Sequence, residues 1–157
     1  MIFSVPQTSV HLLNDGAEIV EDGDVVAVAG KGLVLECRAR GGNPPPALRW
    51  TIGGVLREEA KEHMDTEAGV TVSRLSLQLE RTDQGKTARC EVVHPALEGT
   101  MLSRAGLQIQ YAPLVSVTPA QPFYVEGDSV EIQCSTEAVP AASVIWYRAG
   151  SGELVSR

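Results

Sequence analysis

Short stretches in which apolar and polar residues alternate recur along the whole chain. Alternation with a period of two places the apolar side chains on one face of a β-strand. Gly, Pro and Asp interrupt the stretches at short intervals, as they do in turns between strands. The main stretches are residues 25–30, 33–39, 48–52, 70–79, 88–92 and 107–109. The pattern predicts an all-β sandwich or barrel.

The alternation also predicts which side chains form the core of this domain. In the stretch 70–79, Val70 and Val72 share a single face and the three leucines that follow share a single face, with a slip in phase near Ser73 between the two groups. In the other stretches the phase is regular. The expected core residues are Leu33, Leu35, Cys37, Ala39, Leu48, Trp50, Ile52, Leu75, Leu77, Leu79, Ala88, Cys90, Val92, Leu107 and Ile109.

One acidic stretch, "LREEAKEHMDTEAG" at residues 56–69, shows no alternation and is predicted to be a solvated loop with at most one helical turn. Oxygen ligands of the kind that it carries suit calcium. The spacing of a calcium-binding loop and its required glycine are missing, however, so we expect no metal there. The clustered side chains are Glu58, Glu59, Glu62, His63, Asp65 and Glu67.

An internal repeat divides the chain. "AGKGLVLECRARGGNPPPALRWTIGG" and "EGDSVEIQCSTEAVPAASVIWYRAG" share an alternating strand that ends in a cysteine, a turn with proline, and a tryptophan 12–13 residues later. The two cysteines, Cys37 and Cys134, lie 97 residues apart, which is the length of a β-sandwich domain. The second copy stops at Arg157, soon after Trp146, so we expect it to be less than half a domain.

The three cysteines predict one disulfide and one unpaired thiol. Cys37 and Cys90 are 53 residues apart on apolar strand faces, with Trp50 between them. This order matches a disulfide between two sheets that packs on a buried tryptophan. Closing so long a loop stabilises a domain by about 4 kcal/mol in the chain-entropy model. We expect Cys134 to be unpaired in this chain and to have its partner in sequence beyond it.

Other cysteine and histidine chemistry lacks its signature. A zinc site needs Cys or His ligands at short spacing, and no C-x-x-C or H-x-x-x-H is present. A nucleophilic thiol needs exposure and a nearby base, whereas Cys37 and Cys90 alternate with core residues. The histidines, at positions 11, 63 and 94, lie far apart in the sequence. We therefore predict no catalytic, metal or cofactor site, no small-molecule substrate and no enzymatic activity.

Composition narrows the class of partner. The net charge is −7 and no run of Lys and Arg occurs, which argues against binding to nucleic acid or to an anionic membrane surface. No apolar run reaches 18 residues, and the N-terminus lacks the features of a signal peptide. If the parent protein is secreted or membrane-anchored, we expect the signal and the anchor outside this chain.

These motifs resemble the tandem immunoglobulin domains of cell-surface adhesion proteins. The resemblance is strongest to the nephrin/Kirre (irregular chiasm) group, and the nectins and nectin-like molecules come second. "CRARGGNPPPALRW" resembles the B and C strands of a second domain, and "VTVSRLSLQLERTDQGKTARCEV" resembles its E and F strands. "LQIQYAPLVSV" resembles a G strand that runs into the next domain, and "EGDSVEIQCSTEAVPAASVIWYRAG" the opening of that domain.

One departure from the common immunoglobulin pattern affects the turn before Cys90. Many such domains carry a tyrosine two residues before the second cysteine, where this chain has Ala88. Asp83 also lies one residue further from Cys90 than the pattern requires. The tyrosine corner is therefore missing, as it often is in second domains of the nephrin and nectin type.

The resemblance implies the following organisation. Residues 1–8 form a linker from an upstream domain, residues 9–111 an immunoglobulin-like domain of the C2 or I type, and residues 112–157 the N-terminal part of a second one. Trp50 and Trp146 are the core tryptophans. Tyr111 and Pro113 form a stiff interdomain joint, and "HPALEGT", which starts at His94, is the F–G hairpin, whose tip is a common contact surface.

The resemblance also implies a function. We expect a non-catalytic module from the extracellular part of a plasma-membrane protein at cell contacts, which binds other cell-surface immunoglobulin-superfamily proteins in a homophilic or heterophilic manner. A recognition receptor of the immune type, or a soluble one, is the alternative. An intracellular immunoglobulin-repeat scaffold is a third reading, which the predicted disulfide argues against because cytosolic thiols stay reduced.

Overall fold

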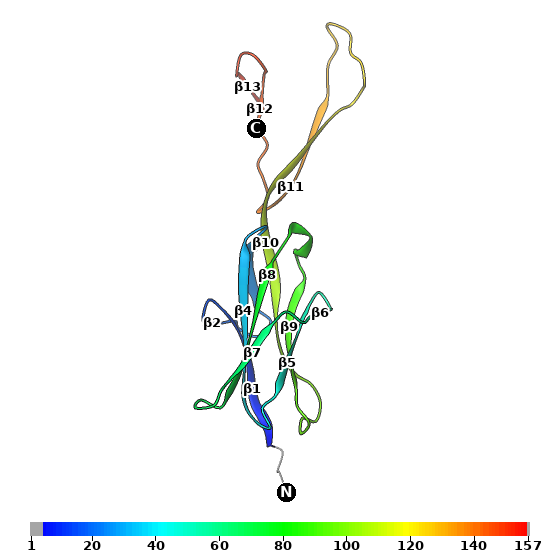
Figure 1. Cartoon of the computed structure of the whole chain (residues 1–157). Coiled ribbons are helices and arrows are strands. Elements are labelled where there is room, and N and C mark those ends of the chain that lie inside the picture. Colours follow the sequence, from blue (N-terminus) through cyan, green and yellow to red (C-terminus); the bar gives the residue numbers. More distant parts are fainter. Residues whose placement is uncertain (1–4, 157) are drawn as a thin grey trace. The chain divides into compact units, whose positions relative to one another are not determined.

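The computed structural model describes residues 5–156, with side chains from Ser9 to Val155 (Figure 1). The chain divides into two compact units, one that ends at Ile109 and one that begins at Gln110. The finer boundaries expected from the sequence, with a linker at residues 1–8 and a domain that ends at Tyr111, stay a prediction.

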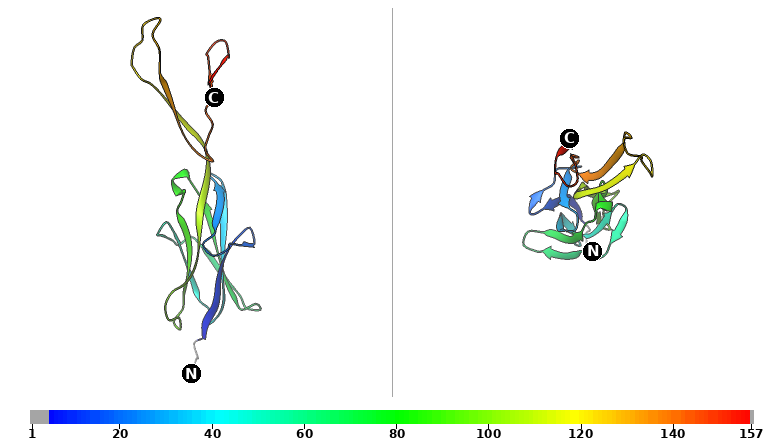
Figure 2. Two further views of the ribbon diagram at one scale, coloured as in Figure 1. Left: turned by 180° about the vertical axis from the view of Figure 1, so that it is seen from behind. Right: turned by 90° about the horizontal axis from the view of Figure 1, so that it is seen from above.

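Unit 1 is a sandwich of two antiparallel sheets that face each other (Figures 1 and 2). The first sheet has the order β2-β1-β4-β8-β7, and the second has the order β10-β9-β5-β6, with β3 paired to β10. The strands of the first sheet are β1 (Val5–Asn14), β2 (Ala17–Glu18), β4 (Gly32–Asn43), β7 (Lys61–Asp65) and β8 (Val70–Gln78). Those of the second are β3 (Asp24–Val28), β5 (Ala47–Ile52), β6 (Val55–Arg57), β9 (Thr87–Val93) and β10 (Met101–Pro119). The all-β immunoglobulin-like sandwich predicted from the sequence is confirmed.

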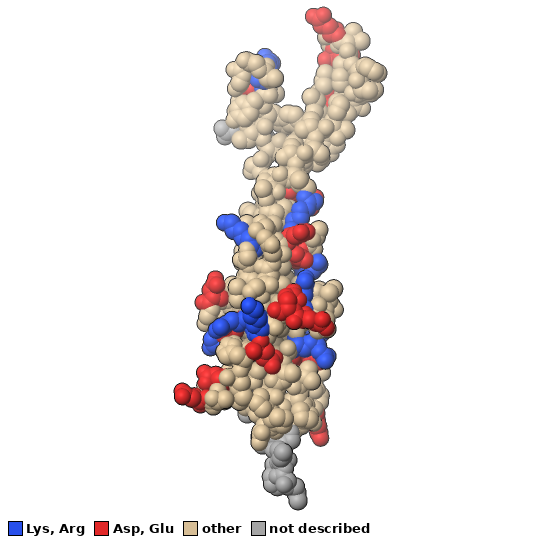
Figure 3. Space-filling model, viewed as in Figure 1, with Lys and Arg blue, Asp and Glu red and all other residues tan. Residues whose placement is uncertain are grey.

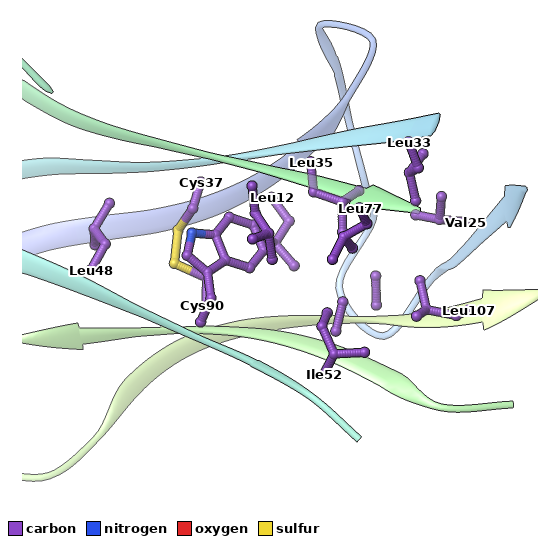
Figure 4. Close-up of a cluster of buried hydrophobic side chains, with 14 of the residues drawn as sticks. Leu12, Val25, Leu33, Leu35, Cys37, Leu48, Ile52, Leu77, Cys90 and Leu107 are labelled. Atoms are coloured by element: carbon purple, nitrogen blue, oxygen red, sulfur yellow. A yellow bond between two sulfur atoms is a disulfide. The ribbon is translucent and has the colours of Figure 1, made fainter. Parts of the chain in front are cut away.

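The core of unit 1 is the layer between the two sheets (Figure 4). Every residue that the alternation assigned to the core is buried there. Leu12 on β1, Val25 on β3 and Ala105 on β10 complete it. Because aromatic residues are few, branched aliphatic side chains fill the space around a single tryptophan, Trp50.

The structure of strand β8 differs from the sequence-based prediction in one respect. We predicted a slip in phase near Ser73, but the pairing of β8 with β4 is continuous, from Gly32 opposite Gln78 to Arg40 opposite Val70. Thr71 and Ser73 therefore share the core face with Leu75. Val70 and Val72 lie on the outer face, as an unbroken strand requires. The slip in phase was predicted wrongly because the polar residues Thr71 and Ser73 occupy the core positions in this part of the strand.

The acidic stretch 56–69 is also more ordered than predicted. Residues Lys61–Asp65 form the edge strand β7, paired along β8 from Lys61 opposite Arg74 to Asp65 opposite Val70. All five side chains of β7 are exposed, so no alternation marks the strand in the sequence. Charged residues on an edge strand prevent further sheet pairing, which explains the composition.

Turns of unit 1 use the residues that their geometry needs. Gly41 and Gly42 have φ angles of 82° and 90°, a left-handed conformation that glycine adopts without strain. The chain then passes through Pro44–Pro46 to β5 in the opposite sheet. The two glycines therefore turn the chain out of the first sheet.

The connection between β8 and β9 contains the 3-10 helix η1 (Arg81–Asp83) and leads to Ala88, the position at which many immunoglobulin domains have a tyrosine. Asp83 accepts hydrogen bonds from the backbone N–H of Glu80 (2.8 Å) and from Nζ of Lys86 (2.7 Å). The bond from Lys86 and then that from the Glu80 backbone hold the pKa of Asp83 below its usual value. Hydrogen bonds of a charged side chain therefore hold this turn, and the small Ala88 is fully buried.

Unit 2 contains the C-terminal part of β10, β11 (Ile132–Val139), β12 (Trp146–Tyr147) and β13 (Leu154–Ser156). Tyr111 to Pro119 pair antiparallel with β11, and β12 pairs with β13. None of the side chains described in this unit is buried. Val117 and Ile132, for example, are 56% and 46% exposed. The unit therefore has no hydrophobic core within its described residues.

Candidate functional surfaces

A disulfide and a tryptophan join the two sheets of unit 1. Cys37 on β4 and Cys90 on β9 form a disulfide with their Cα atoms 6.4 Å apart. Trp50 lies opposite Cys90 in the pairing of β5 with β9 and is fully buried. Its indole Nε1 donates a hydrogen bond of 3.0 Å to Oγ of Ser73 on the opposite sheet. The loops and faces at the surface are therefore attached to a rigid centre.

Four of the residues singled out from the sequence lie in unit 2. Cys134 is a free, half-buried cysteine on β11. Trp146 is half-buried on β12, and Tyr111 is half-buried opposite Val139. Pro113 is exposed. Their roles as core tryptophan, unpaired thiol and joint stay predictions.

The loop between β9 and β10 occupies residues 94–100, where the sequence predicted the F–G hairpin. His94, at its base, is 7% exposed. Its Nδ1 accepts a hydrogen bond from the N–H of Ala96 (3.1 Å), so the ring proton lies on Nε2, which donates to the carbonyl of Pro44 (2.8 Å). The side chain thus ties the loop to the β4–β5 connection, while Glu98, at the tip, is exposed.

The outer face of the first sheet is hollowed. A hollow of about 470 Å³ has Leu13, Val70 and Val72 at its base, all less than 10% exposed. Charged and polar side chains surround these apolar groups. They face outward because, along each strand, they alternate with the residues that face the core. We call this surface the β4–β8 hollow; its remaining lining residues are Ser9, His11, Glu18, Glu36, Arg38, Arg40, His63, Asp65, Ala68 and Arg74.

Glu36 is the central charge of the β4–β8 hollow. Its carboxylate accepts hydrogen bonds from Nε of Arg38 (2.5 Å) and from Nε of Arg74 (2.6 Å). Partial burial raises the pKa of Glu36, but the bonds to the two arginines outweigh this effect and hold it below its usual value. Glu36 therefore stays charged and holds two arginine side chains on the outer face of the first sheet.

The acidic residues of 58–67 do not converge on one point. Glu62 reaches across to β5, where its Oε2 accepts the backbone N–H of Leu48 (2.8 Å). This N–H lies beyond the end of the pairing with β6, which covers only Trp50–Ile52. Asp65 accepts the N–H groups of Glu67 and Ala68 in a local turn. Among the residues that the structure describes, no three His, Cys, Asp or Glu side chains are placed to hold a metal ion together.

Two further carboxylates, Asp22 and Asp24, also have a structural role. Gly23 donates its N–H to the carbonyl of Val20 (2.7 Å), so the two residues flank a turn. Asp22 binds the guanidinium of Arg104 with both oxygens. The hydrogen bond from Arg104 lowers the pKa of Asp22.

Sequence reasoning found the disulfide, the core tryptophan and the F–G loop, and missed several polar contacts. Ser73 could have been found, since it lies at even spacing from Leu75 and Leu77. No sequence signal marked the bonds of His94 and Glu62, because their partners are backbone groups distant in sequence.

No helix within the described part of the chain has the length and apolar character needed to cross a membrane.

Comparison with known protein families identifies the family of unit 1. Residues 14–100 match the model of the CD80-like C2-set immunoglobulin domain. This match covers more than half of the chain and contains both cysteines of the disulfide.

Cell adhesion molecules are among the similar curated proteins. Cell adhesion molecule 1 of Homo sapiens is 29% identical over 127 residues, which are 78% of this chain and 29% of that protein. Cell adhesion molecule 2 of Xenopus tropicalis is 27% identical over 160 residues, covering 98% of this chain and 35% of that protein. The chain thus spans roughly a third of the length of these relatives.

A solved structure shares the fold. The full ectodomain (Ig1–Ig3) of mouse nectin-like molecule 4 superposes with a TM-score of 0.69 at 20% sequence identity. The superposition covers 96% of this chain and 52% of that one. At this identity the likeness concerns the fold alone.

Proposed function

The chain belongs to the family of CD80-like C2-set immunoglobulin domains, and we propose that it is a non-catalytic recognition module of an extracellular cell-adhesion protein. Its partners are other cell-surface proteins of the immunoglobulin superfamily. Recognition is non-covalent and uses the faces and loops of the sandwich.

The observation that carries this proposal is the similarity to cell adhesion molecules across almost the whole chain. The alignment to cell adhesion molecule 2 extends over 98% of the chain, so it includes unit 2 as well as the family match in unit 1. The Cys37–Cys90 disulfide supports an extracellular setting, because disulfides persist in oxidising compartments. It speaks against the intracellular scaffold, in which the cysteines would be reduced.

Of the two adhesion groups expected from the sequence, the relatives support the nectin-like one. Cell adhesion molecules 1 and 2 and nectin-like molecule 4 all carry adhesion or nectin-like names, whereas the nephrin/Kirre likeness is not confirmed. We therefore place the chain beside the nectin-like molecules, with an immune-type or soluble receptor as the alternative.

We assign recognition to the β4–β8 hollow. It combines an apolar base with charged side chains that Glu36 already holds in place. Groups fixed before binding lose little conformational entropy when a partner docks, which favours affinity. The loop at residues 94–100, held by His94, is a second contact region at the far end of β9.

The expectations for unit 2 complete the proposal. Residues 112–157 belong to a second immunoglobulin-like domain, in which Trp146 is the core tryptophan. Cys134 has its partner cysteine in sequence beyond this chain. Tyr111 and Pro113 form a stiff joint between the domains. The parent protein is anchored in the plasma membrane by a segment outside this chain.

A binding experiment tests the function. The 157-residue chain is biotinylated, assembled on streptavidin and applied to cells that each display one immunoglobulin-superfamily ectodomain. We expect saturable binding to at least one of them. Arg40→Ala with Arg74→Ala should weaken it about tenfold, equivalent to about 1.4 kcal/mol. Lys31→Ala, which removes an exposed cation from the β3–β4 turn, should leave it unchanged.

Two results would contradict the proposal at different levels. Absence of binding to every displayed ectodomain would overturn the adhesion function. Binding that is equally strong for the Arg40/Arg74 variant and the Lys31 control would retain the function and reject the β4–β8 hollow as its site.

A further inference from the structure

The register of β4 and β8 places four side chains at the corners of a square in the β4–β8 hollow. Glu36 lies opposite Arg74, and Arg38 lies opposite Val72. All four side chains line the hollow, so they share the outer face of the first sheet. We call these four residues the β4–β8 square. The two arginines occupy one diagonal of it, and Glu36 and Val72 occupy the other.

Two guanidinium groups of the square share one carboxylate. Arg38 donates from Nε to Oε1 of Glu36, and Arg74 donates from Nε to Oε2. The three side chains together carry one net positive charge, on a chain whose net charge is −7. Within the described residues neither arginine has a second carboxylate partner. A guanidinium has five N–H donors, so each arginine keeps the donors of its two Nη atoms for a ligand.

The fourth corner of the square is apolar and leaves room for that ligand. Val72 is only 7% exposed, whereas the side chains of Arg38 and Arg74 are 48% and 56% exposed. Val72 lies directly across from Arg38 and two residues, about 7 Å, along β8 from Arg74. A carboxylate above Val72 is therefore next to both arginines. Arginine binds carboxylates in this way through paired N–H groups.

Strand β7 borders this corner on one side. His63 lies opposite Val72, and Lys61, two residues earlier, adds a positive charge. Asp65 lies opposite Val70. The charge of Asp65 disfavours a second carboxylate at that point, whereas the side chain of Val70, which is 9% exposed, offers an apolar contact.

Strands β1 and β2 border the square on the side away from β8. Leu13 lies opposite Glu36, and His11 lies opposite Arg38. His11 is bound through Nδ1 to Glu18 on β2 (2.6 Å), so this carboxylate has a partner within the chain. The sheet order places β2 three strands from β8. The acidic residues of this edge therefore leave the corner at Val72 accessible to an anion.

The mixture of charges favours a single carboxylate over a long polyanion. The lining of the hollow contains Glu18, Glu36 and Asp65 as well as its arginines. Figure 3 likewise shows basic and acidic side chains intermixed on the visible face of unit 1. A sulfated glycan needs a continuous row of basic groups. One pair of guanidinium groups beside an apolar base fits an acidic side chain with an apolar neighbour, as a protein segment carries them.

We propose that the β4–β8 hollow binds an acidic side chain of the partner protein, with its carboxylate above Val72 between Arg38 and Arg74. An apolar side chain two residues away in the same extended segment contacts Val70, because residues two apart on a strand share one face. This inference rests on the proposed function, to which it adds the chemistry of the partner: an acidic and an apolar residue separated by one position.

Nuclear magnetic resonance of the 157-residue chain tests the proposal with a defined peptide. The probe is acetyl-TLTETLT-amide, and acetyl-TLTQTLT-amide is its neutral counterpart. The arginine Nε–Hε signals report on the square during each titration. Arg38→Gln and Val72→Asp alter the site, while Val72→Thr and Arg49→Gln, the latter at an exposed position of β5, are the controls. Circular dichroism and melting temperature verify that each variant folds.

We expect the acidic peptide to shift the Nε–Hε signals of Arg38 and Arg74 in a saturable manner. The neutral peptide, and the acidic peptide with Arg38→Gln, should bind at least about tenfold more weakly, since a charge-assisted hydrogen bond is lost. Val72→Asp should abolish binding, because it places a carboxylate of the chain itself at the fourth corner. The two controls should bind as the wild type does.

Three results would overturn the proposal: equal binding of the acidic and neutral peptides, shifts that leave Arg38 and Arg74 unaffected, and tighter binding of a heparin octasaccharide to the same arginines. The last result would assign the hollow to sulfated glycans. The proposed function is tested separately. Ectodomain binding on cells without any response to the peptide would reject this inference alone, and a response to the peptide without any ectodomain binding would reject the adhesion function alone.

Discussion

The indole nitrogen of Trp50 lies 3.0 Å from the hydroxyl oxygen of Ser73, and this hydrogen bond connects the two sheets of unit 1. Both residues are at most 1% exposed, so neither group has water as an alternative partner. The bond explains why a serine occupies a core position of β8. The disulfide and the indole therefore act together as the rigid centre of the sandwich.

Replacing Ser73 tests this relationship. Ser73→Ala leaves the buried indole N–H without an acceptor and should destabilise the chain by about 1–3 kcal/mol. Trp50→Phe removes the donor, so adding Ser73→Ala to it should cost less than in the wild type. Urea unfolding of the two single variants and the double variant measures the coupling. Additive effects, or an Ser73→Ala variant as stable as the wild type, would contradict the account.

Thr71 offers the opposite case on the same strand. It is 2% exposed, and its Oγ1 has no hydrogen-bond partner among the described residues. Thr71→Val replaces the hydroxyl by a methyl group of similar shape, so it should stabilise unit 1 by about 1 kcal/mol. The expected sign is a higher urea midpoint at an unchanged slope. Thr87→Val, at an exposed position of β9, serves as the control and should be neutral; a lower midpoint for Thr71→Val would show that the hydroxyl is satisfied.

Strand β8 also shows how far the sequence could lead. Its existence, and the burial of Leu75 and Leu77, follow from alternation alone. The face of Val70 does not, because a local pattern cannot reveal that Thr71 and Ser73 are the residues opposite Ala39 and Cys37. Register with a strand distant in sequence decides the matter, and with it the apolar base of the β4–β8 hollow.

Glu36 gives stability a dependence on pH. Its pKa in the folded chain lies below the ordinary value of 4.5, so the unfolded chain binds a proton first as the pH falls. The contribution of Glu36 is thus complete above about pH 5 and is lost as the pH drops through the folded pKa. Glu36→Gln should cost about 0.5–1 kcal/mol at pH 7 and much less at pH 3.

Melting temperatures of the two proteins from pH 3 to pH 7 measure this difference. Glu98→Gln, on the exposed tip of the loop at residues 94–100, is the control and should leave the melting temperature close to that of the wild type. A gap between wild type and Glu36→Gln that widens toward pH 3 would reverse the predicted sign and exclude the proposed role of the two arginines.

His94 should control the order of the loop at residues 94–100. His94→Phe keeps a ring of similar size but leaves the carbonyl of Pro44 and the N–H of Ala96 without their partners. We expect a loss of about 1–2 kcal/mol and faster amide hydrogen exchange at residues 96–100. Exchange that accelerates equally throughout β9 and β10 would indicate general destabilisation in place of a local tie.

The candidate surfaces were less predictable than the fold. The Cys–Trp–Cys order predicted the sandwich because few folds bring these three residues together. The β4–β8 hollow depends on charged side chains from four strands. In the sequence, each of these side chains by itself is indistinguishable from an ordinary solvated residue. Glu62 illustrates the difference: the sequence places it in an acidic cluster, whereas the fold uses it for one backbone N–H of Leu48.

The extracellular assignment underlies the proposed function, and the redox state of the cysteines tests it most directly. The chain is secreted from cells, labelled with a thiol reagent with and without prior reduction, and its intact mass is measured. We predict one labelled thiol, Cys134, before reduction and three after it, with a peptide that links Cys37 to Cys90. Three reactive thiols in the secreted, unreduced chain would contradict the account and favour an intracellular immunoglobulin scaffold.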